Sequence, residues 1–80
     1  MPNLSPDRQD PILVALGGAI RRARIKKGLS QERLALLADV DRSYMGRVER
    51  GDNVIALLTL ARLAEALGVS MSELMADAGL

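Results

Sequence analysis

Apolar residues recur every three or four positions along most of the chain, which is the spacing that places them on one face of an α-helix. The first such pattern contains Leu16 and Ile20 and lies between Pro11 and Gly28. Asp10 is suited to cap this helix, and proline is favoured in the first helical turn. Glycine is common just beyond a helix C-terminus because it adopts positive φ at little cost. The sequence therefore predicts a first helix from Pro11 to about Gly28.

Four further helices are predicted from the same start and stop signals. A Ser or Asp side chain caps the start, and glycine or a short break marks the end. The expected spans are Ser30 to Ala38, Asp41 to Arg50, Ala56 to Leu67, and Ser70 to about Ala78. The positions expected to face inward include Leu34, Leu37, Ala38, Met45, Val48, Leu60, Leu63 and Leu67. No segment alternates apolar and polar residues for long enough to predict a strand. The predicted fold class is all-α, a compact five-helix bundle.

Two adjacent glycines interrupt the first predicted helix at Gly17 and Gly18. Each costs roughly 1 kcal/mol in a helix interior relative to alanine. Either another element packs close to the backbone there, or the helix is frayed before residue 17. The sequence leaves both explanations open.

The composition removes most kinds of catalytic and metal site. The chain has no cysteine and no histidine, so it offers no disulfide, no thiolate nucleophile and none of the commonest metal ligands or general bases. Its carboxylates and lysines show no pairing within an apolar pocket. We therefore expect no enzyme activity, no metal and no cofactor.

At 80 residues the chain is long enough for one domain. We expect a flexible N-terminal segment at 1–10 and the folded domain at 11–80. The opening residues lack the apolar stretch of a secretory signal, and no apolar run approaches the roughly 20 residues of a membrane span. The protein is expected in the cytoplasm, associated with the bacterial nucleoid and not with a membrane.

Charge is distributed unevenly although the formal net charge is only +1. Residues 21–50 hold nine basic and four acidic side chains, whereas residues 51–80 hold one basic and four acidic side chains. This division suggests one face turned toward a polyanion and another turned away. An ordinary solvated surface explains the charges equally well.

The second and third predicted helices fit a helix-turn-helix between Gln31 and Gly51. Ala35 supplies the small residue where the two helices cross, and Leu34, Val40, Met45 and Val48 would hold them together. The outward positions of the third helix are then Arg42, Ser43, Gly46 and Arg47, with Tyr44 to one side. A simple pair of packed helices would explain the apolar spacing but not the basic and small outward residues. Arginine presents a donor fork that matches guanine in the major groove.

Tyr44 is the only aromatic residue. Proteins that bind single-stranded nucleic acid stack bases on several aromatic rings. Double-stranded DNA is therefore the favoured target.

From Leu16 to Leu74 the chain resembles the lambda-repressor/Cro-type (XRE) helix-turn-helix domains. The resemblance rests on the order and spacing of several short pieces together. These are Leu16-Gly17, Ile20-Arg21 with Arg24, Gly28-Leu29-Ser30-Gln31, Leu34-Ala35, Ser43-Tyr44-Met45, Val48-Glu49-Arg50-Gly51, Leu60, Leu63-Ala64-Glu65-Ala66-Leu67-Gly68-Val69-Ser70 and Glu73-Leu74.

The resemblance implies a role for each matching residue. Base edges would be read by Arg42, Ser43 and Arg47. DNA phosphates would be contacted by Gln31, Tyr44 and Arg50, with Asn53 as a weaker candidate. Arg24 and Glu49 match a structural ion pair between the first and third helices, and the alternative for Arg24 is a phosphate contact.

The chain departs from the family pattern at two places. Gly46 stands in the middle of the third helix, where a side chain is usual. Either the missing side chain permits close approach to a base edge, or glycine is a tolerated substitution at this position. Gly46 is expected to contact DNA under the first explanation. The second departure is the stretch 54–56, where many relatives carry a proline and a hydroxyl cap, so the usual signal for the start of the fourth helix is missing.

One recognition helix reads few base pairs, so we expect a homodimer on a palindromic operator. The expected interface is Leu57, Leu58, Met71, Met75 and Leu80. Leu57 and Leu74 fit the monomer core nearly as well.

The predicted function is sequence-specific transcriptional control without a small-molecule ligand. A restriction-modification controller, a phage or mobile-element repressor and an antitoxin-like autoregulator all fit this pattern, with the first two favoured. The alternative from another class is a protein-interaction module that uses the same fold as a bridging factor. Acidic or apolar residues at positions 42 and 47 would have favoured that alternative, whereas both are arginine.

Overall fold

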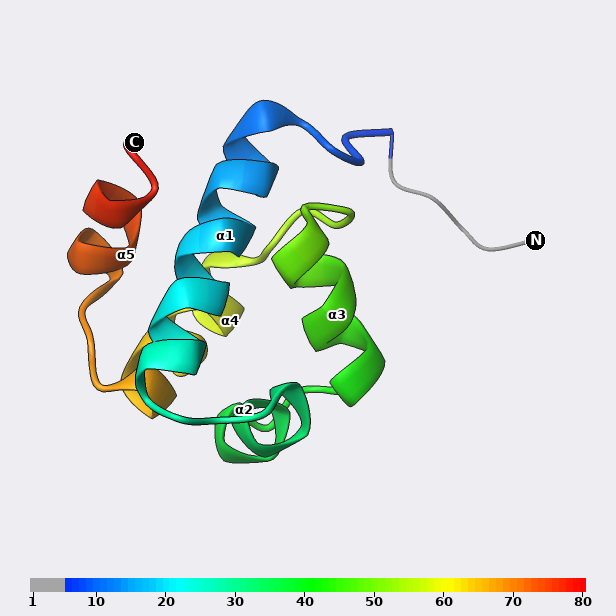
Figure 1. Cartoon of the computed structure of the whole chain (residues 1–80). Coiled ribbons are helices and arrows are strands. Elements are labelled where there is room, and N and C mark those ends of the chain that lie inside the picture. The colour runs from blue at the N-terminus through cyan, green and yellow to red at the C-terminus, as the bar shows by residue number, and fades with distance from the viewer. Residues whose placement is uncertain (1–5) are drawn as a thin grey trace.

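The computed structural model describes residues 6–80 of the chain. They form five helices, which are α1 (Pro11–Lys26), α2 (Gln31–Ala38), α3 (Arg42–Arg50), α4 (Leu57–Leu67) and α5 (Met71–Asp77). In Figure 1, α1 runs through the middle of the molecule between α3 and α5, and α2 closes the lower end. Within this described part there is no strand, and no helix is long and apolar enough to cross a membrane. The predicted all-α fold is confirmed.

The helix starts follow the side-chain caps in the sequence. The Asp10 carboxylate accepts from the Ile12 amide at the start of α1, and the Ser30 hydroxyl accepts from the Arg33 amide at the start of α2. Ser70 and Glu73 form a complete capping box on α5. Ala56 precedes α4 without a side-chain hydrogen bond. The fourth helix therefore begins at Leu57 without a side-chain cap.

Side chains from the first four helices meet in the centre of the molecule. Ile20, Leu34, Met45 and Leu63 are completely covered, and α5 contributes Leu74 to the same cluster. Burial of this kind stabilises a fold by roughly 25 cal/mol for each Å² of apolar surface removed from water. The core therefore lies where α1 to α4 converge, and α5 closes one side of it.

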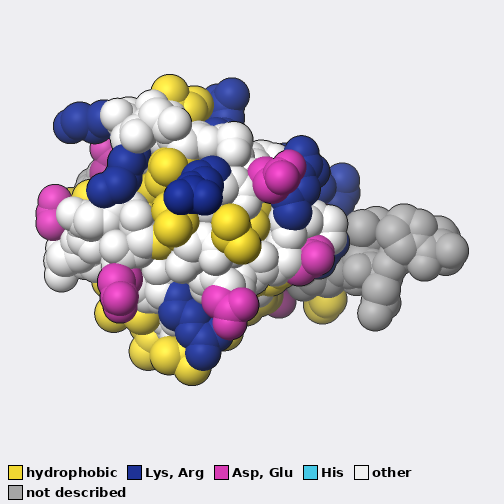
Figure 2. Space-filling view, turned by 90° about the horizontal axis from the view of Figure 1, so that it is seen from below, with side chains coloured by type: hydrophobic (Ala, Val, Ile, Leu, Met, Phe, Trp, Pro, Cys, Tyr) yellow, Lys and Arg dark blue, Asp and Glu magenta, His cyan; other side chains and the backbone are white. Residues whose placement is uncertain are grey.

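The prediction that Leu37 faces inward is wrong. The buried arc of α2 is formed by Leu34, Ala35 and Ala38, and Leu37 lies at the edge of this arc, where its side chain is exposed. Its neighbour Leu36 is exposed as well. Figure 2 looks onto the end of the molecule that α2 closes and shows hydrophobic side chains between basic and acidic ones.

The glycine pair in α1 is explained by a close helix crossing. A β-carbon on Gly17 would lie 2.3 Å from the Val48 carbonyl oxygen and 2.8 Å from that of Glu49. Only a glycine at this point lets α1 approach the backbone of α3 so closely. Gly18 has no such backbone neighbour, since a β-carbon there would meet only the Arg22 guanidinium at 3.3 Å. Because α1 is regular from Pro11 onward, the frayed start is not observed.

Candidate nucleic-acid interface

The turn between α2 and α3 is short and is fixed by two aspartates. Asp39 ends α2 with φ of 57°, and its amide donates to the carbonyls of Ala35 and Leu36. Asp41 begins α3, and its carboxylate accepts from the Ser43 amide at 3.1 Å. The two helices are thus joined by only three residues, as a helix-turn-helix requires.

The residues expected to read base edges lie on the outer side of α3. Arg42 and Ser43 are exposed, and Arg47 is half-buried one turn further on. The Arg47 guanidinium lies within 3.5 Å of the Ser43 hydroxyl oxygen and 5.9 Å from the centre of the Tyr44 ring. With the Asn53 amide oriented to satisfy both of its atoms, its oxygen accepts from Arg47 Nε at 3.3 Å. Arg47 is therefore positioned by three neighbours, whereas Arg42 extends into solvent.

Two titratable side chains flank this outer face. The Ser43 hydroxyl donates to the Asp41 carboxylate, and this hydrogen bond lowers the Asp41 pKa below its usual value. Burial raises the pKa of Tyr44, which shares a hydrogen bond with Thr59. At neutral pH the face therefore carries an ionised carboxylate at the N-terminus of α3, where the helix dipole stabilises it, and a neutral tyrosine.

A buried ion pair fixes the inner side of α3. Arg24 Nε lies 2.7 Å from Glu49 Oε2 and its Nη2 lies 3.1 Å from Oε1, while the side chains are 11% and 2% exposed. Arg24 Nη1 also donates to the Leu29 carbonyl at 2.8 Å. The ion pair predicted between α1 and α3 is present, and its geometry gives Arg24 a structural role.

Gln31 joins this pair from the start of α2. Its amide nitrogen donates to Glu49 Oε1 at 3.0 Å, so the side chain is anchored on its inner side. The Gln31 side chain is half-buried. One glutamate thus holds α1, α2 and α3 together directly beneath the outer face.

Gly46, which was expected on the outward side of α3, is covered by a neighbouring side chain. It is buried, and a β-carbon there would lie 3.1 Å from Arg50 Nη1 and 3.9 Å from Gln31 Oε1. The guanidinium of Arg50, one turn later, folds back over this position. The missing side chain thus leaves room for the Arg50 guanidinium.

Arg50 itself is tethered by residues that the sequence did not single out. Arg50 Nε donates to Asp52 Oδ2 at 2.9 Å, and Arg8 Nε lies 3.3 Å from Asp52 Oδ1. The Gln9 amide group also donates to the Asp52 carboxylate. Hydrogen bonds from Arg50 and Gln9 lower the pKa of Asp52, so the carboxylate is ionised at neutral pH.

Residues 6–10 belong to the segment that was expected to be flexible, and residues 1–5 of that segment lie outside the described part. The only sequence signal for the contact between Arg50 and Asp52 is an acidic residue two positions after the basic end of the third helix. No sequence signal links Asp52 to its partners Arg8 and Gln9, which lie more than 40 positions earlier in the chain.

A second candidate surface is apolar and lies at the start of α4. Leu57 is 72% exposed and Leu58 is 63% exposed. Met71 and Leu80 are exposed too, whereas Met75 packs partly against the core. The prediction that Leu57 could belong to the monomer core is thus wrong, while Leu74 does belong to the core.

In the described residues no group of three or more acidic side chains is arranged to hold a metal ion.

Comparison with known proteins adds three relatives and one family. A helix-turn-helix family model matches residues 20–74. The "Neisseria hypothetical transcription factor" of Neisseria meningitidis is 40% identical over 75 residues, which are 94% of this chain and 70% of that protein. Control protein C.MunI of a Mycoplasma species is 34% identical over 82% of this chain and 90% of its own length. The crystal structure of the restriction-modification controller protein C.AhdI from Aeromonas hydrophila superposes with a TM-score of 0.76 and 48% identity, covering 78% of this chain and 94% of that one.

Proposed function

The chain belongs to the XRE-type helix-turn-helix family of transcription regulators, and from this premise we propose that it binds double-stranded DNA sequence-specifically as a homodimer on a palindromic operator. One observation carries the proposal. The outer face of α3 presents Arg42, Ser43 and Arg47, while a buried ion pair fixes the inner side of the same helix. A rigid helix with outward arginines is what base recognition in the major groove needs.

The proposed contacts divide into two kinds. Arg42, Ser43 and Arg47 meet base edges, and each arginine can bind guanine O6 and N7 through two parallel hydrogen bonds. Gln31 and Arg50 contact phosphates, with the amides at the start of α2 adding donors. Tyr44 and Asn53 support Arg47 and contribute phosphate contacts from the edge of the face.

Dimerisation is proposed through the exposed leucines at the start of α4. A twofold dimer places two recognition helices about one DNA turn, roughly 34 Å, apart and doubles the bases that are read. Leu57 and Leu58 supply apolar surface that the monomer leaves in water. Met71, Met75 and Leu80 extend the proposed interface onto α5 and the C-terminus.

Sedimentation analysis tests the dimer with a matched pair of variants. Leu58→Asp should yield a monomer with much weaker operator binding, because it places a charge in the interface. Leu36→Asp changes an equally exposed leucine on α2 and should leave the dimer intact. A Leu58→Asp variant that sediments as the wild type does would exclude α4 from the interface.

Among regulators, we favour the restriction-modification controller type. The support is the similarity to control protein C.MunI and to controller protein C.AhdI over most of the chain. We propose that the protein acts in the cytoplasm on the genomic DNA, without catalytic activity and without a small-molecule ligand.

Selection from a random duplex library, followed by mobility shifts at several salt concentrations, tests DNA binding. A palindromic consensus with steep salt dependence is expected, since phosphate neutralisation releases counterions. Arg47→Ala should relax the sequence preference, whereas Gln31→Ala should weaken binding to all duplexes more evenly. Absent or salt-independent binding would favour a protein-interaction module instead, and equal loss of discrimination in both variants would contradict the assigned roles.

A further inference from the structure

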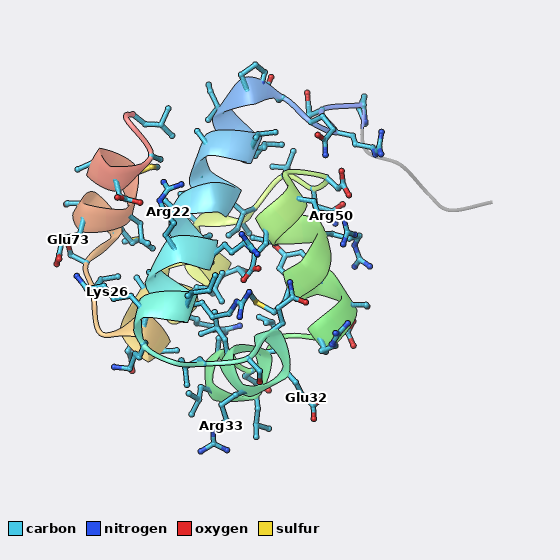
Figure 3. The ribbon with its side chains drawn as sticks, viewed as in Figure 1. Arg22, Lys26, Glu32, Arg33, Arg50 and Glu73 are labelled. Atoms are coloured by element: carbon cyan, nitrogen blue, oxygen red, sulfur yellow. The ribbon has the colours of Figure 1, made fainter. Side chains whose placement is uncertain are left out.

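The N-terminal residues 6–10 pack across the end of α3. The Gln9 amide donates to the Gly51 carbonyl at 2.7 Å, and its side-chain amide donates to the Arg50 carbonyl at 2.8 Å. Gln9 adopts φ of 65°, a conformation that non-glycine residues rarely hold without support from their surroundings. Figure 3 shows Arg50 beside this segment at the end of α3. The segment is thus tied to the helix by backbone and side-chain bonds.

Asp52 is the centre of this arrangement, and its carboxylate is largely covered. The Asp52 side chain is 11% exposed, whereas Arg8 and Arg50 are 48% and 61% exposed. Both arginines approach the carboxylate through Nε. The carboxylate therefore binds the inner edge of each guanidinium. The terminal nitrogens of both arginines remain available to an anion in the solvent.

The position of this cluster relates it directly to the outer face of α3. The Asn53 amide that accepts from Arg47 also donates to the Asp52 carbonyl at 3.0 Å. Arg50 Nη1 lies over Gly46, beside Gln31. The cluster thus continues the surface that carries the proposed base and phosphate contacts.

A carboxylate at this place would repel DNA phosphates unless nearby positive groups compensated its charge. Two guanidiniums share one carboxylate, so the three side chains together keep a net positive charge. Fixing both arginines in advance lowers the conformational entropy lost when they bind an anion.

We propose that Asp52 is a positioning residue that fastens the N-terminal segment to the end of α3 and presents Arg8 together with Arg50 to the phosphate backbone of duplex DNA. Arg8 thereby becomes a DNA contact outside the helix-turn-helix. This inference rests on the proposed function and adds to it a contact from the N-terminal segment.

Asp52→Asn gives a test in which the sign of the effect is decisive. Charge alone predicts tighter DNA binding when an acid near phosphates is neutralised. Positioning predicts the opposite, a loss of affinity of about fivefold, because Arg8 and Arg50 are released. The matched control is Glu32→Gln, which neutralises an exposed acid on α2 and should bind as well as or better than the wild type.

Arg8→Ala tests the new contact by salt dependence on the selected operator and on random duplex. We expect about fivefold weaker binding to both and a salt slope lower by about one for each bound protomer. Arg22→Ala removes an arginine from the α1–α5 side of the molecule (Figure 3) and should change neither quantity. The variant Arg8→Ala/Asp52→Asn should lose less than the sum of the single losses, since both act through one contact.

The outcomes separate the two proposals. A wild-type protein without salt-dependent duplex binding would overturn the proposed function. A wild type that binds, together with tighter binding by Asp52→Asn or an unchanged salt slope in Arg8→Ala, would overturn only the role of Asp52 and Arg8. Thermal unfolding followed by circular dichroism checks that each variant is folded. If Asp52→Asn fails to fold, Arg8→Ala alone decides, because half-exposed Arg8 is no part of the core.

Discussion

On its inner side α3 is held by buried Met45 and Val48 and by the Arg24–Glu49 ion pair, whereas on its outer side Arg42 and Ser43 are exposed. The inner side chains are fixed by packing and by charge pairing in a water-poor environment. The outer ones touch only each other and a few neighbours at the edge. Stability and recognition are therefore separated across the width of a nine-residue helix, and substitutions on the two sides should affect different measurements.

The largest effect is expected for Glu49→Ala on the inner side. It leaves Arg24 without its buried partner, and breaking such a pair lowers the free energy of unfolding by about 3–5 kcal/mol. Urea denaturation of the variant measures this. Arg24→Met combined with Glu49→Leu should recover much of the loss, because two apolar side chains leave no buried charge. A loss under about 1 kcal/mol for Glu49→Ala would place the pair among ordinary surface ion pairs.

Gly17→Ala should come next, again through stability. Its β-carbon would collide with two carbonyl oxygens of α3, and overpacking of this kind costs about 3 kcal/mol at the upper end of its range. Gly18→Ala is the matched control in the adjacent position and should stabilise the protein by up to about 1 kcal/mol through helix propensity. Comparison of the two melting temperatures is sufficient. Equal effects at both positions would mean that α1 and α3 are further apart than described.

Arg47→Ala probes the outer side. Loss of one bidentate base contact should reduce discrimination between operator and altered duplexes by about 2 kcal/mol. The free energy of unfolding should change by less than about 1 kcal/mol, because Arg47 is only half-buried and is no part of the core. Competition binding and urea denaturation on the same preparation measure both quantities. A variant that loses stability but keeps its discrimination would reverse the assignment of the two sides.

Gly46→Ala should have the smallest effect, because position 46 lies between the inner and the outer side of α3. The new methyl group displaces only the mobile end of Arg50, and better helix propensity compensates, so stability should change by less than about 1 kcal/mol. Operator affinity should fall slightly as Arg50 moves, with the sequence preference unchanged. Titration of operator variants measures this. A changed preference as large as that of Arg47→Ala would restore close approach to a base edge as the role of Gly46.

The helices and their boundaries were largely predictable because the signals for them are local. Asp10, Ser30, Asp41 and Ser70 cap the four helices for which they were expected to. A cap acts within three residues, so sequence proximity is enough to find it. The exposed positions of Arg42 and Ser43 followed from the helical repeat in the same way.

The predictions that failed concern which side of a helix is covered. Leu37 is apolar yet exposed, and Gly46 is buried although the helical repeat places it on the outward side of α3. Leu37 is exposed because the buried face of α2 is narrow and ends beside it. Gly46 is buried because the Arg50 side chain folds back over it. Helical periodicity gives the direction of a side chain but not what lies in that direction.

Spacing and capping in the chain were thus enough to establish five helices, a helix-turn-helix and the side of α3 that carries arginines. Only the folded arrangement brought Arg8 and Gln9 to Asp52, which lies more than 40 positions away along the chain. It also explained Gly17, since the backbone of α3 fills the place of its side chain. The physical reason is range. Helix signals act over one turn, whereas charge pairing and close packing depend on how distant segments meet in space.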